Sequence, residues 1–155
     1  MPNAENETQQ DRNVAIVRRF IDSWVNGRDP DVIEQTWADD MAWHGGSLGT
    51  YQGRDAFTQF TATNAAGAFA DMHLEIHELI AHDDKVVARF TNSGTNIGPF
   101  LNQPPTGKHA EWLGIGIYTL RNGRITEGWF AEDILGLLLQ LDAIALPAND
   151  GYTAS

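Results

Sequence analysis

Apolar positions in the N-terminal part of the chain fall at helical spacing. Residues 1–11 are polar and acidic, and should be disordered because they offer little to bury. Over residues 14–25 apolar side chains recur three or four positions apart, which predicts a first helix. An Asp-Pro start signal predicts a second helix over about 30–40. A short strand at 41–44 and a glycine-rich loop should then precede a third helix over about 54–64.

The period of the pattern changes to two in the second half of the chain. Alternating apolar and polar residues predict strands at about 72–77, 86–91, 109–120 and 124–131. A leucine-rich helix should follow at about 134–141. Helices, then antiparallel strands, then a terminal helix indicate the α+β class. We expect a curved antiparallel sheet that wraps the N-terminal helices into a cone, with a C-terminal helix.

Length and composition favour one domain and make some classes of partner unlikely. The 155 residues fit a single domain over 12–144, with an irregular tail over 145–155. The net charge of −11 with ten basic residues makes nucleic acid and anionic membranes unlikely partners. There is no cysteine, the first residues do not resemble a signal peptide, and no apolar run approaches the ~20 residues that span a bilayer. A cytoplasmic location is expected.

Several short segments occur in a characteristic order: VRRF, NGRDPDVI, ADDM, YQGRDAF, DDKVVARFTNSGT, PPTGK and NGRITEGW. In that order and spacing the chain resembles the SnoaL-like polyketide cyclases of the nuclear-transport-factor-like superfamily, over about residues 12–142. The resemblance implies a cone-shaped fold and an intramolecular aldol closure. It also places Phe130 where those cyclases carry a proton-transferring Asp, and Gly116 where they carry a His. Neither residue can carry a proton, so the chemistry needs another group.

The resemblance also sets which strand face lines the pocket. If position 116 faces inward like the cyclase His, alternation turns Trp112, Gly114, Gly116 and Tyr118 inward on the strand before Phe130. The two glycines either leave room for a flat apolar ligand or mark bulges in the sheet. Inward asparagines on the strand before can bond a ligand or cap loops. The expected substrate-binding set is Trp43, Asn92, Asn96, Trp112, Gly114, Gly116 and Phe130.

The opposite face of the same strands is strongly apolar. Alternation turns Leu113, Ile115 and Ile117 outward, and on the next strand it turns Ile125, Glu127 and Trp129 outward as well. Consecutive outward aliphatic side chains should not meet water, so we expect a homodimer interface formed by Leu113, Ile115, Ile117 and Trp129. The alternative is that the C-terminal tail covers them.

Three residues are candidates for catalysis. His44, at the end of the first strand, has a side chain suited to acid–base work, or else bonds the neighbouring glycine backbone. Tyr118 can donate to a developing enolate, or is a core tyrosine with a satisfied hydroxyl. Asp133 opens the last helix, where capping is worth ~1 kcal/mol. Its neighbour Glu132 lies just past the expected strand, where alternation no longer assigns a face.

No metal site and no cofactor are expected. His73, His77 and His109 lie on the outer face by alternation and do not converge, and the sequence has no phosphate-binding loop or catalytic triad. Three functions fit the residues. The first is a cyclase or isomerase of a polyketide-like or polycyclic substrate, with His44 as a relocated base. The second is a hydroxylase-like member of the same family, and the third is a non-catalytic binding protein for an apolar metabolite.

Overall fold

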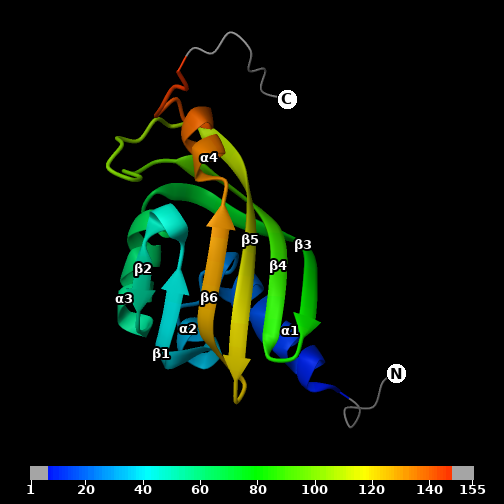
Figure 1. Ribbon diagram of the computed structural model, residues 1–155. Helices are drawn as coiled ribbons and strands as arrows, with labels where there is room; N and C mark the ends of the chain where they lie inside the picture. The colour runs from blue at the N-terminus through cyan, green and yellow to red at the C-terminus, as the bar shows by residue number, and fades with distance from the viewer. Residues whose placement is uncertain (1–6, 148–155) are drawn as a thin grey trace.

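The computed structural model describes residues 7–147, so residues 1–6 and the last eight positions of the predicted tail lie outside the description (Figure 1). Its elements follow the predicted order of helices, strands and a final helix. They are α1 (Gln9–Arg19), η2 (Phe20–Val25), α2 (Asp31–Thr36), β1 (Trp37–His44), η3 (Gly46–Leu48), β2 (Thr50–Gln52), α3 (Arg54–Thr61), η4 (Ala62–Ala66), β3 (Phe69–His82), β4 (Lys85–Asn96), β5 (His109–Arg121), β6 (Arg124–Glu132) and α4 (Ile134–Gln140).

The predicted α+β class is confirmed. Six strands form one curved sheet in the order β2-β1-β6-β5-β4-β3, with the N-terminal helices behind it and α4 at one end (Figure 1). Helix α1 packs on β3 and β4, α3 packs on β1, and α4 packs on β5. One pairing departs from the expected antiparallel sheet, because β1 runs parallel to its neighbour β6. No helix in the described part of the chain is long and apolar enough to cross a membrane.

Helix α1 begins earlier than predicted. The hydroxyl of Thr8 accepts a hydrogen bond from the backbone N–H of Asp11 (3.1 Å), and the carboxylate of Asp11 accepts one from the N–H of Thr8 (3.1 Å). This capping box satisfies amides of the first turn with polar groups alone. The expectation of disorder up to residue 11 is therefore wrong for residues 8–11, where the polar sequence is a helix start.

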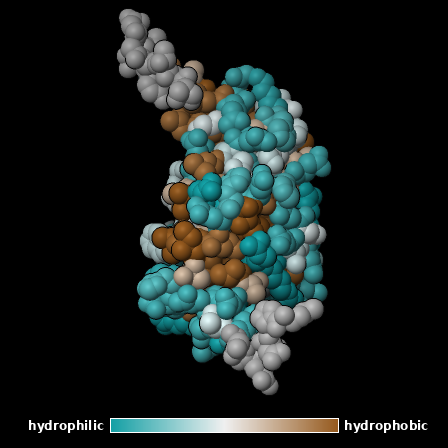
Figure 2. All heavy atoms as spheres, turned by 90° about the vertical axis from the view of Figure 1, so that its right-hand side faces the viewer, coloured by the Kyte–Doolittle hydropathy of each residue, from teal (hydrophilic) through white to brown (hydrophobic). Residues whose placement is uncertain are grey.

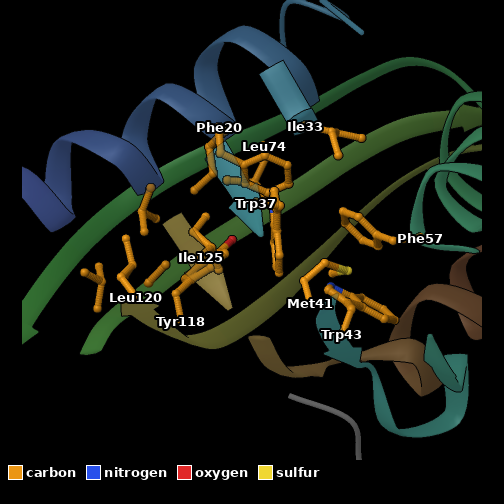
Figure 3. Packing of buried hydrophobic residues seen from close by; sticks show 14 of the residues in the cluster. Phe20, Ile33, Trp37, Met41, Trp43, Phe57, Leu74, Tyr118, Leu120 and Ile125 are labelled. Carbon is orange, nitrogen blue, oxygen red and sulfur yellow. The ribbon is translucent and has the colours of Figure 1, made fainter. Parts of the chain in front are cut away.

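The second helix ends earlier than predicted, because Trp37 adopts an extended backbone and begins β1. Its indole is completely buried and lies edge-on to Phe20, with the ring centroids 5.3 Å apart, and 5.0 Å from the ring of Phe57. Figure 3 shows these rings meeting between the helices and the sheet. Burial of each such side chain contributes about 1.5–3 kcal/mol, which outweighs the preference of a single residue for helix.

A β-bulge changes which residues of β6 face inward. Thr119 pairs with Glu127 and Leu120 pairs with Ile125, so Thr126 is an extra residue on β6. Ile125 is therefore fully buried in the core, and the predicted outward orientation of this residue is wrong. Beyond the bulge the alternation predicted from Phe130 holds, with Trp129 exposed and Gly128 buried.

Candidate functional site

A cavity of about 110 Å³ lies between the sheet and the helices. Its wall is mostly aromatic and includes Trp43, Trp112, Tyr118 and Phe130, the four residues predicted to line a common cavity. The ring of Phe130 stacks on Trp43 with centroids 5.4 Å apart and meets Tyr118 edge-on at 5.2 Å. Glu132 carries the one carboxyl group in the lining of this cavity, and the lining contains no histidine. Its other ionisable side chain, Tyr118, ordinarily titrates well above neutral pH.

The carboxylate of Glu132 is held in place by two donors. Its Oε1 accepts a hydrogen bond from Nδ2 of Asn92 (2.7 Å) and another from Nε1 of Trp112 (2.9 Å). The residue keeps some accessible area toward the cavity, whereas its carboxylate is closely surrounded by protein. This burial raises the pKa of Glu132 above the ordinary value of 4.5, against the opposing effect of the two hydrogen bonds. Oε2 has no such bond to any residue from 7 to 147, so it is free for proton transfer.

Glu132 is the functional candidate that sequence reasoning leaves unassigned. Strand β6 extends to this residue, so Glu132 and Phe130 lie on the same face two positions apart. Glu132 pairs with Gly114 across the sheet, and a Cβ atom placed on Gly114 would lie 3.1 Å from the Cγ of Glu132. Extending the alternation by two residues would have found it.

Tyr118 supplies a neutral hydroxyl group to the same cavity. Burial, and then the nearby charge of Glu132, raise the pKa of Tyr118 well above its usual range, so the phenol stays protonated. Its hydroxyl makes no hydrogen bond to the part of the chain described here, in contrast to the satisfied hydroxyl of a typical core tyrosine. The group can therefore donate to an oxygen atom of a ligand.

Asn92 offers an acceptor beside these two groups. The residue is only 4% exposed, and its Oδ1 is sealed from solvent without a partner in the described structure. A buried polar atom without a partner costs about 1–3 kcal/mol, so this acceptor is a local cost to stability beside the cavity.

The inward glycines have a role that neither sequence interpretation anticipates. A Cβ atom on Gly114 would lie 2.3 Å from the ring of Phe90, and one on Gly116 would lie 2.4 Å from the ring of Phe130. Both interpretations are corrected, because these side chains fill the space and the pairing of β5 with β4 is continuous at both glycines. The glycines let aromatic rings of neighbouring strands lie flat on the sheet.

Gly116→Ala should therefore destabilise the fold by about 1–3 kcal/mol, because the added methyl group displaces the ring of Phe130. The free energy of unfolding of each variant is measured by denaturation in urea. The matched control is the same substitution in a Phe130→Ala background, where the ring is gone and alanine should be neutral or slightly stabilising in the strand. An equal cost in both backgrounds would contradict this role of Gly116.

His44 does not line the cavity, so the expectation that its side chain reaches the cavity is wrong. Its ring stacks on Trp129 with the centroids 3.8 Å apart, and its Nε2 lies 3.6 Å from a carboxylate oxygen of Glu127. Trp43 faces the cavity, and alternation turns the next residue of β1 to the outer face of the sheet.

Two other candidates have local structural roles. Oδ1 of Asp133 accepts a hydrogen bond from the N–H of Gly136 (2.9 Å) and so caps α4, and the residue does not line the cavity. Asn96 is buried at the end of β4, where Oδ1 accepts from the N–H of Thr106 (2.8 Å) and Nδ2 donates to backbone carbonyls. In the structure Asp133 caps a helix and Asn96 closes a loop, and neither residue lines the cavity.

The outer face of the sheet is apolar where alternation predicts it. Leu113, Ile115, Ile117 and Trp129 are between 40% and 54% exposed. The described part of the tail, residues 145–147, leaves them uncovered. Figure 2, which turns the right-hand side of Figure 1 toward the viewer, shows hydrophobic atoms gathered near the middle of the molecule. That a second copy of the chain covers these four side chains stays a prediction.

Comparison with known proteins identifies one family and solved structures with the same fold. The family model for SnoaL-like polyketide cyclase matches residues 15–141, and no curated protein matches the chain significantly. A solved structure of a proposed polyketide cyclase from Bacillus cereus ATCC 10987 is 31% identical, with a TM-score of 0.71 and coverage of 87% of this chain and 83% of that one.

Two further solved structures share the fold at lower identity. A proposed SnoaL-like polyketide cyclase from Jannaschia sp. CCS1 has a TM-score of 0.80 and 23% identity, covering 88% of this chain and 95% of its own. AclR from Streptomyces galilaeus, a proposed hydroxylase, has a TM-score of 0.76 and 22% identity, covering 88% of this chain and all of its own (100%).

Proposed function

Because this chain belongs to the SnoaL-like polyketide cyclase family, we propose that it catalyses an aldol-type ring closure or isomerisation of a polyketide-like substrate, with Glu132 as the proton-transferring group. One observation carries the proposal. A buried carboxylate is fixed by Trp112 and Asn92 through one oxygen, while its other oxygen is free in an aromatic cavity. This arrangement replaces the acid that the family resemblance places at position 130.

The reaction needs only proton transfer and one new carbon–carbon bond. The carboxylate of Glu132 removes a proton from a carbon beside a carbonyl group, and the Tyr118 hydroxyl donates to the developing enolate oxygen. The enolate carbon then bonds to the carbon of a second carbonyl group in the same molecule. The resulting alkoxide takes the proton back, so the substrate is isomerised without an oxidant. The raised pKa makes Glu132 a stronger base than an ordinary carboxylate.

The size of the cavity limits which part of the substrate reaches the acid. At about 110 Å³ it is smaller than an engineered apolar cavity of ~150 Å³ that binds benzene. The cavity therefore accommodates at most about one ring, or part of the chain segment that folds into one. The remainder of a longer substrate lies outside it.

Heptane-2,6-dione is a direct test, because its aldol closure gives 3-hydroxy-3-methylcyclohexanone, which then loses water to form 3-methylcyclohex-2-enone. We expect the protein to accelerate the appearance of enone absorbance above buffer, at the same rate with and without oxygen. His44→Ala should retain this activity, since His44 lies on the outer face of the sheet. Oxygen dependence would favour the hydroxylase-like function. Quenching of tryptophan fluorescence by the diketone without turnover would favour a binding protein.

A further inference from the structure

A second cavity adjoins the first. It has a volume of about 220 Å³ and lies between η2 and the helical segment formed by α3 and η4. Five residues line both cavities, so the two lie directly against each other. The five residues are Trp24, Val25, Thr61, Ala65 and Met72.

The two cavities carry opposite charges. Glu132 is the one charged side chain in the lining of the inner cavity, and Arg28 is the one charged side chain in the lining of the outer cavity. Within residues 7–147 the guanidinium of Arg28 has no ion pair and no hydrogen bond. The carboxylate of the neighbouring Asp29 instead accepts a hydrogen bond through Oδ1 from the N–H of Asp31 (3.1 Å), at the start of α2.

The backbone fixes the position of Arg28 at the cavity. The residue has a left-handed conformation with φ of 58°. Its N–H donates to the carbonyl of Trp24 (2.8 Å), and the next N–H, of Asp29, donates to the carbonyl of Ser23 (3.0 Å). Gly27 permits this turn, since a Cβ atom there would lie 2.5 Å from the Ser23 carbonyl oxygen. The root of the Arg28 side chain is therefore fixed at the wall of the outer cavity, while the residue itself is exposed to solvent.

We propose that the outer cavity is a subsite for a carboxylate group of the substrate, bound by Arg28 while the apolar part reaches Glu132. The proposal rests on the function proposed above and narrows its substrate class to acidic polyketide-like molecules. A guanidinium group matches a carboxylate with two parallel hydrogen bonds. With a net charge of −11 the protein repels anions in general, so a dedicated cation is needed to admit one.

The test compares two probes that differ only in charge, 5-phenylpentanoate and 5-phenylpentanamide. Binding is followed by tryptophan fluorescence, since Trp24 lines both cavities. We expect Arg28→Gln to weaken binding of 5-phenylpentanoate about three- to tenfold and to leave binding of 5-phenylpentanamide unchanged. The matched control is Arg18→Gln, which makes the same change in charge at another exposed arginine, on α1, that lines neither cavity. Added salt should weaken binding of 5-phenylpentanoate to the unaltered protein. It should not affect binding of the amide, or binding of either probe to Arg28→Gln.

The subsite would be overturned if Arg28→Gln and Arg18→Gln changed the affinity for 5-phenylpentanoate equally. It would also be overturned if Arg28→Gln lowered the affinities for the two probes equally. Failure of both probes to bind the unaltered protein would also overturn it. Diketone closure is measured with a neutral substrate that does not need Arg28, so the catalytic proposal can stand or fall separately.

Discussion

Glu132→Gln should lower kcat for diketone closure by about 10²–10⁴-fold, the contribution usual for a positioned general base. The amide oxygen of glutamine can still accept the hydrogen bonds from Trp112 and Asn92, so the cavity keeps its shape and KM should change little. The matched control is Glu127→Gln, on the outer face of the same strand, which should keep full activity. Equal activities of the two variants would exclude Glu132 as the base.

The same residue should give a pH dependence in both activity and stability. The base form is the carboxylate, so kcat should rise with pH through the raised pKa of Glu132, and this rise should be absent in Glu132→Gln. A raised pKa means that the folded state binds the proton more tightly than the unfolded state. Glu132 therefore lowers stability progressively as pH rises from the ordinary value of 4.5 through the folded pKa.

Thermal unfolding measures that second effect. Near neutral pH the glutamine variant should have a higher Tm than the unaltered protein, because it buries no charge. The difference should shrink as the pH falls below 4.5, where Glu132 is protonated in both states. A lower Tm for the variant at neutral pH would show that the carboxylate is charged and well compensated, contrary to the raised pKa.

Tyr118→Phe should lower kcat about 10²–10³-fold, the usual effect of removing one donor to a developing oxyanion. The hydroxyl has no partner in the described structure, so phenylalanine leaves no protein group unsatisfied and stability should not fall. The control is Tyr51→Phe. It removes a hydroxyl that donates to the carbonyl of Leu48 (2.9 Å), and it should cost about 0.5–1.5 kcal/mol of stability without loss of kcat.

The opposite pattern for Tyr118→Phe, with unchanged kcat and a lower Tm, would show a purely structural tyrosine. Measuring both quantities for both tyrosines separates a donor to the substrate from a core side chain.

Strand alternation was the most reliable guide from sequence to site. It places Trp112 and Tyr118 in the cavity because β5 keeps a strict period of two over its buried length. The same rule, applied to Trp43, would have turned His44 outward. The prediction that His44 is the base depended instead on the chemistry of imidazole, which does not indicate the face of the sheet to which the side chain points.

Other features depend on contacts that a single strand does not reveal. The bulge at Thr126 arises from the pairing of β6 with β5, so the inward orientation of Ile125 could not be read from β6 alone. A glycine in a strand shows that a side chain is missing, but not which ring occupies the space. Here Phe90 and Phe130 do so from the two neighbouring strands. Glu132 was missed because the strand was expected to end one residue earlier.

The position of Glu132 on β6 bears on regiochemistry. The resemblance to the cyclases places their acid at position 130, and two residues along a strand correspond to roughly 6.8 Å. A substrate bound in the same orientation would present to Glu132 a carbon several bonds further along its chain. The ring that closes first would then differ in position or size from the one made by a relative with the acid at 130. Moving one carboxylate along a strand, with the fold unchanged, is thus a simple route to a different product from the same precursor.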